Sequence, residues 1–281
     1  MTRARPRSGL HGLVLVWLAL VASGCAANLG AVRDFASTSS DAAQYTQLIG
    51  TYVSTPTRLM RYEPESQRPV LARQAAERTA QQEPLLLRQR LIQSYMDGLG
   101  QLAADGLATY NTQLDGLGRA LQAAQFTDQS EAAALAAVSK QLANAATERW
   151  RRDKLVTLIE QSDAPFQVVV GALVTIVETG FVADLANERE AVNKYYTELQ
   201  LRSRDPAGLA ALGEWRDMRE AQIRDREAAI GSYVVVLKTI GSGHHKLYES
   251  RHQLSHVDVQ AQVHQYTSRL REAVNAIRSF H

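Results

Sequence analysis

Histidine side chains recur near the C-terminal end of the chain at a spacing that suits metal binding. In the segment HHKLYESRHQLSH, residues 244–256, four candidate ligands follow one another at intervals of four, three and four positions: His245, Glu249, His252 and His256. On one α-helix, this spacing places the four side chains on one face, within about 60° of each other. Imidazole and carboxylate groups bind Zn²⁺ and other transition metals. One hypothesis is therefore a zinc site on the last helix.

Two other roles for these histidines remain open. The same helical face continues toward the C-terminus as an apolar seam, Val259, Val263, Tyr266, Leu270, Ala273 and Ile277. The polar residues that precede this seam, from His245 to His256, are also typical of a solvated end of a helical bundle. There, histidines make ordinary hydrogen bonds. A pH-sensitive contact is a third interpretation, because histidine titrates near neutrality.

The second group with distinctive chemistry is Cys25, the one cysteine of the chain. It ends the stretch LVLVWLALVASGC, residues 13–25, and Arg3, Arg5 and Arg7 precede that stretch. The apolar run of about ten residues is too short to cross a bilayer, which takes roughly 20. A basic start, a short apolar segment and small residues are typical of a secretory signal peptide. A single cysteine also cannot form an internal disulfide.

The tetrapeptide Ala22-Ser23-Gly24-Cys25 resembles the lipobox of bacterial lipoproteins, with alanine at the position where leucine is typical. The resemblance covers residues 1–28. It implies that residues 1–24 are removed, that the Cys25 thiol receives diacylglycerol, and that the new amino group is acylated. Two acyl chains already give stable membrane anchoring. Since Ala26 follows the cysteine, the resemblance implies the periplasmic face of the outer membrane, with the inner membrane as the less favoured location.

Removal of the signal peptide changes the charge of the protein. The full chain has a formal charge of +2, but the loss of three arginines leaves 28 basic against 29 acidic side chains. No overall basic field remains to attract nucleic acid. The chain also lacks G-x-S-x-G, H-E-x-x-H, P-loop and C-x-x-C motifs, and has no G-x-G-x-x-G after a predicted strand. We therefore expect a protein that is neither an enzyme nor a nucleic-acid binder, and zinc is the one cofactor considered.

Composition and periodicity predict an all-α fold, an elongated antiparallel bundle of long helices. Residues 25–28 form the lipidated start and a short tether, and residues 29–281 form a single periplasmic domain with a proline-rich loop at 54–69. Asp163-Ala164-Pro165 and Asp205-Pro206 are typical helix starts, and Ile240-Gly241-Ser242-Gly243 is typical of a helix end. The last helix is therefore expected from Ser242 to residue 280. These signals predict four final helices of about 35–40 residues, each roughly 50–60 Å long.

One segment, VVVGALVTIV at 168–177, is apolar on nearly every side of a helix. Its apolar members are Val168, Val169, Val170, Leu173, Val174, Ile176 and Val177. Such a helix lies either in a protein core or in lipid. The expected place is the centre of the bundle, against residues 233–240. The alternative is a concealed apolar hairpin near 165–185 that perturbs membranes when released.

The function expected from these features is protein–protein interaction or scaffolding in the cell envelope, from a lipid anchor on the membrane and without catalysis. The alternatives are the membrane-perturbing hairpin and the periplasmic metal-binding protein described above. The segment EWRDMREAQIRDRE, residues 214–227, is predicted to be a solvated face with local ion pairs. Its other interpretation is a face that binds the partner, whose identity the sequence does not indicate.

Overall fold

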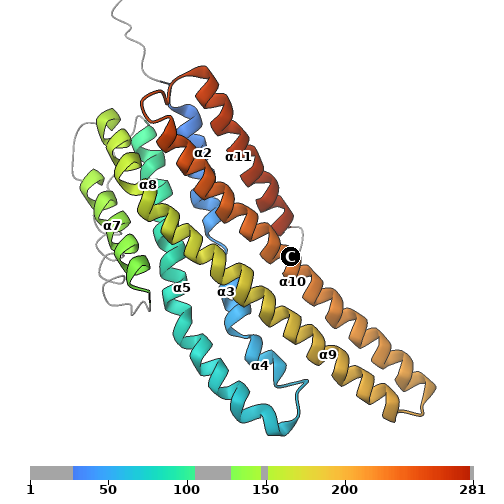
Figure 1. Cartoon of the computed structure of the whole chain (residues 1–281). Coiled ribbons are helices and arrows are strands. Elements are labelled where there is room, and N and C mark those ends of the chain that lie inside the picture. The colour runs from blue at the N-terminus through green and yellow to red at the C-terminus, as the bar shows by residue number, and fades with distance from the viewer. Residues whose placement is uncertain (1–27, 105–127, 147–150, 279–281) are drawn as a thin grey trace, which may run out of the picture.

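The protein is an elongated bundle of antiparallel helices, as predicted. The computed structural model describes residues 28–104, 128–146 and 151–278, and these residues form helices and turns with no strand among them. Figure 1 shows most helices lying along one long axis. The predicted all-α fold class is confirmed.

The helices have very unequal lengths. The elements are α2 (Gly30–Ala43), α3 (Thr46–Val53), α4 (Thr55–Leu59), a 3-10 turn η1 (Glu65–Gln67), α5 (Arg68–Ala103), α7 (Gln129–Ala146), α8 (Arg151–Thr175), a π-helical stretch η2 (Ile176–Phe181), α9 (Val182–Arg202), α10 (Pro206–Glu249) and α11 (Val257–Arg278). The prediction of four final helices of similar length is therefore wrong.

Two long helical rods form the axis of the bundle. The first comprises α8, η2 and α9 without interruption, and the second is the antiparallel α10 (Figure 1). After the turn between the rods, α10 begins at the predicted helix start. Asp205 caps the helix by accepting a hydrogen bond from the backbone N–H of Gly208 at 2.8 Å, and Pro206 occupies the first turn. Helices α2, α5 and α11 pack against these rods around one apolar core.

Two predicted helix boundaries are wrong. Helix α8 continues through Pro165, so Asp163-Ala164-Pro165 is not a helix start. Helix α10 continues through residues 240–243 to Glu249. The glycines there serve packing: a Cβ on Gly243 would overlap the buried ring of Phe35, and a Cβ on Gly241 would lie 3.3 Å from Val170 Cγ1. Close approach of neighbouring helices explains these glycines better than chain termination.

The proline-rich segment 54–69 is more ordered than the predicted loop. It contains α4 and the 3-10 turn η1, and the long helix α5 already begins at Arg68. Pro56 and Pro69 each occupy a first turn of a helix, where a missing N–H costs nothing. The prolines therefore start helices here.

The apolar segment 168–177 lies mainly in the core, as expected. Val169, Val170, Leu173, Val174 and Val177 are buried, Ile176 is half-buried, and Val168 is 42% exposed. Helix α8 packs against α10, the helix that contains residues 233–240. The predicted hairpin near 165–185 is wrong, because the chain stays helical from Arg151 to Arg202 without turning back.

Within the described residues, one helix is long and apolar enough to cross a membrane by length and composition, Lys154–Arg202. Core helices of soluble proteins have the same properties, and 39% of the apolar window of this one is buried among its neighbours.

Candidate functional site

The histidine stripe does not form on one helix. His245 and Glu249 lie in the last two turns of α10, whereas His252 and His256 lie in the turn before α11. The single-helix geometry behind the predicted zinc site is therefore wrong, since α10 ends at Glu249. Within the part of the chain that the structure describes, no group of three or more His, Cys, Asp or Glu side chains is placed to hold a metal ion.

Asp163 forms a buried polar network with two of the histidines. Its Oδ1 lies 2.9 Å from His244 Nδ1, and its Oδ2 lies 2.8 Å from His245 Nδ1. The other ring nitrogen of His244, Nε2, lies 2.6 Å from the hydroxyl of Tyr95. A neutral His244 with its proton on Nδ1 satisfies this pattern, because it donates to Asp163 and accepts from Tyr95.

Burial and hydrogen bonding together set the charge states of His244 and Asp163. Desolvation lowers the pKa of His244, although the hydrogen bond to Asp163 opposes that shift. Burial alone would raise the pKa of Asp163, but hydrogen bonds from His244 and His245 hold it at about 2. His244 and Tyr95 are both fully buried, whereas the side chain of His245 is half exposed. The network joins α5, α8 and α10.

The far end of the α9–α10 hairpin exposes apolar side chains to solvent. No residue from 197 to 222 is buried. The exposed apolar side chains of this tip are Leu201 (82%), Leu209 (38%), Trp215 (52%) and Met218 (46%). Charged residues surround them, including the ion pairs Arg216–Asp217 and Arg224–Glu220. We refer to residues 197–222, where these exposed apolar side chains lie among charged ones, as the hairpin tip.

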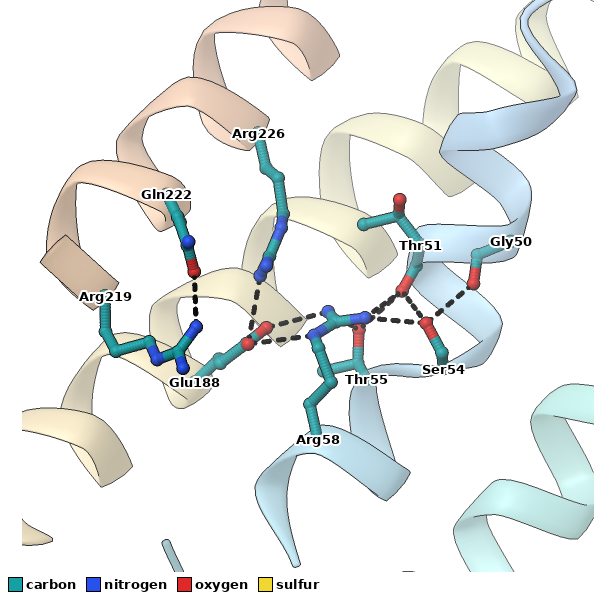
Figure 2. Close-up of polar contacts among 9 residues, drawn as sticks. All are labelled: Gly50, Thr51, Ser54, Thr55, Arg58, Glu188, Arg219, Gln222 and Arg226. Carbon is teal, nitrogen blue, oxygen red and sulfur yellow. Dashed lines mark hydrogen bonds and ion pairs between the residues drawn. The ribbon is translucent and has the colours of Figure 1, made fainter. Parts of the chain in front are cut away.

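A buried ion-pair cluster fixes the base of this hairpin, as Figure 2 shows. Arg58 of α4 donates two hydrogen bonds to the Glu188 carboxylate of α9, at 2.8 and 2.7 Å. Arg226 of α10 donates a third to the same carboxylate, at 3.0 Å. The remaining N–H groups of Arg58 are held by the backbone oxygen of Thr51, at 2.8 Å, and by the hydroxyls of Ser54 and Thr55. One carboxylate, 4% exposed, thus connects three helices.

A cleft of about 590 Å³ opens between α5 and η2. Both of its walls contain an irregular helix. Pro84 lies inside α5, where a proline typically costs about 3 kcal/mol or more because it removes a backbone hydrogen bond. The facing wall is the π-helical stretch η2. π-Helices are rare in proteins overall, and those that occur are often found at functional sites.

At the other end of the bundle, the start of the described chain is held tightly. The backbone oxygen of Asn28 accepts a hydrogen bond from Gln260 Nε2 at 2.5 Å, and the same amide donates to Ser255 O at 3.2 Å. Ala31 and Val32, in the first turn of α2, are already buried. Cys25, the predicted lipidation site, lies outside the described residues.

Sequence reasoning missed three of these features. The hairpin cluster and the Asp163 network join residues that are 130, 81 and 149 positions apart, which no local pattern indicates. The cleft leaves only a weak signal in the sequence, Pro84, which lies inside α5.

Comparison with known proteins finds no match to a family model, to a curated protein or to a solved structure. Function is therefore inferred from the residues and the geometry of this chain alone.

Proposed function

We propose that the protein is a lipoprotein on the periplasmic face of the bacterial outer membrane, and that it works by binding a protein partner without catalysis. The observation that carries this proposal is the separation of two ends. The described chain begins with Asn28 and α2 at one end of the bundle, three residues after the lipobox-like Cys25 in the sequence, and the tip of the α9–α10 hairpin lies at the other end (Figure 1).

The connection between lipid and bundle is short. Cys25 precedes Asn28 by three residues, so their Cα atoms lie within about 11 Å of each other. Asn28 is bound to Gln260, and α2 is buried from its first turn. A lipid on Cys25 would therefore hold the α10–α11 end of the bundle close to the membrane surface.

The hairpin tip then projects away from that surface. Helix α10 has 44 residues and connects the two ends, which corresponds to about 65 Å. Trp215 is the central candidate for contact, because aromatic side chains dominate binding energy at protein interfaces. We expect the partner to offer an apolar groove with a polar rim, which complements Trp215 and Met218 and their charged neighbours.

Site-specific photo-cross-linking in intact cells tests this proposal. A photoreactive amino acid is placed at Trp215, and in a matched control at Val235, which is similarly exposed (52% and 50%) but lies outside the hairpin tip, about two thirds of the way along α10. We expect one discrete cross-linked product from position 215, absent from position 235 and lost when Cys25→Ser prevents anchoring. Equal products at both positions, or no product at 215, would contradict the proposed role of the tip.

A further inference from the structure

We propose that the cleft between α5 and η2 is a binding site for a small ligand that carries an ammonium group on an apolar body. This proposal depends neither on the lipid anchor nor on the hairpin tip. The volume of about 590 Å³ lies in the range of ligand pockets, 300–1,000 Å³. The chemical class of the ligand follows from the groups on the two walls.

The α5 wall presents hydrogen-bond acceptors. Glu77, Ala80, Gln81 and Pro84 line the cleft at the spacing of one helical face. Because Pro84 has no N–H, the carbonyl of Ala80 loses its normal partner within the helix. A donor from a bound ligand can satisfy that exposed carbonyl.

The η2 wall presents an acceptor of the same kind. The hydroxyl of Thr179 donates to the backbone oxygen of Thr175 at 2.6 Å, so its hydrogen is already used and its oxygen can only accept another bond. Gly180, the next residue, faces the hydroxyl of Tyr52 on the same cleft, since a Cβ built on Gly180 would lie 3.5 Å from that hydroxyl. Ile176 of η2 and Leu85 of α5 supply apolar surface.

Charge decides between a cation and an anion. Arg78 donates to Asp184 at 3.0 Å, and its guanidinium also lies 4.1 Å from the centre of the Tyr52 ring. Arg88 is paired with both oxygens of Glu131. Both arginine charges on the cleft are therefore compensated.

Glu77, in contrast, makes no ion pair with any residue that the structure describes. The uncompensated charge on the cleft is thus negative, and the acceptors beside it need donors. A primary ammonium group meets both requirements, and the apolar part of the ligand would lie against Leu85 and Ile176.

Two probes with the same ring and opposite charge test the proposal: tryptamine and indole-3-propionate. Calorimetric titration uses the protein as purified from its cells, at pH 7, with titration of each probe into buffer subtracted. We expect tryptamine to bind at least ten-fold more tightly than indole-3-propionate. Equal affinity, tighter binding of the anion, or no saturable binding of tryptamine would overturn the proposal.

Matched variants assign the binding to this cleft. Glu77→Gln should remove the preference for the cation, whereas Glu83→Gln, on the same helix but outside the lining, should keep it. Pro84→Ala returns an N–H to the Ala80 carbonyl, so it should weaken tryptamine binding several-fold in a chain that is at least as stable. If Glu77→Gln leaves the ratio of affinities unchanged, the site lies elsewhere and the proposal is wrong.

Discussion

The carboxylate of Glu188 binds the guanidinium of Arg58 through two hydrogen bonds, although 130 positions of sequence separate the two residues. Arg226 shares the same carboxylate. This contact is the point at which α4, α9 and α10 meet, directly below the exposed hairpin tip. One buried acidic group therefore connects the α9–α10 hairpin to α4.

Replacing Glu188 should destabilise the fold strongly. Glu188→Gln leaves Arg58 and Arg226 without their partner, and breaking a buried ion pair typically costs about 3–5 kcal/mol. Since both arginines retain some solvent contact, we expect about 2–3 kcal/mol here. Urea unfolding followed by circular dichroism measures this loss. Glu198→Gln on the same helix, in an exposed pair at 3.7 Å, should change stability by less than about 0.5 kcal/mol. Similar effects of both substitutions would contradict the role of the cluster.

Stability should fall as the pH decreases below 6.5, because His244 is buried in its neutral form. Its pKa is lower in the folded chain than the usual 6.5, mainly through desolvation. Above that pH the group is neutral in both states, and below it the unfolded chain binds a proton that the folded chain does not. The free energy of unfolding should therefore decrease by up to about 1.4 kcal/mol per pH unit. His244→Gln should have a shallower dependence between pH 7 and 5, and an unchanged slope would exclude His244 as the cause.

Asp163 should contribute stability that persists to lower pH. Its folded pKa of about 2 lies below the usual 3.8, so the contribution is complete above the unfolded value and disappears as the pH falls toward 2. At pH 6, Asp163→Asn should cost about 2 kcal/mol, and the difference from the unmodified chain should shrink below pH 4. Chemical unfolding at several acidic pH values measures that difference. A constant difference across this range would mean that ionised Asp163 is not the stabilising species.

Two glycines of α10 should respond in opposite directions to alanine. A Cβ at Gly243 would overlap the buried ring of Phe35, so Gly243→Ala should destabilise by about 1–3 kcal/mol. At Gly231 no atom lies within 4 Å of the added Cβ, so Gly231→Ala should stabilise by about 0.5–1 kcal/mol. Thermal unfolding of the two variants compares them directly. Stabilisation by both would show that α2 does not approach α10 as closely as described.

Local signals in the sequence predicted the class of fold and some of its boundaries. Asp205-Pro206 begins a helix as expected. This start is readable from the sequence because the capping hydrogen bond joins residues only three positions apart, Asp205 and Gly208. The segment 214–227 makes the expected local ion pairs, but Arg226 and Glu227 pair with residues of α9, and Ile223 is buried. Gly241 and Gly243 were misread because a glycine that ends a helix and a glycine that admits a neighbouring helix look alike in sequence. His252 and His256 were placed on a helix for the same reason.

The site features depend on tertiary contacts and were therefore not predictable. The pairing of Glu188 with Arg58 and the cleft opposite Pro84 arise only when distant helices meet. The lipobox resemblance differs from both, because the chemistry at Cys25 depends on a short local sequence and on no fold.

Mass spectrometry of the N-terminal peptide tests the central proposal, that the protein is anchored through lipid on Cys25. The protein is purified from bacterial membranes, with and without globomycin, and compared with Cys25→Ser. We predict that the processed chain begins at Cys25 with acyl chains on its sulfur and amino group, and that both treatments abolish this form and change the location of the protein. An N-terminus elsewhere, or an unmodified Cys25 with unchanged location, would contradict the account.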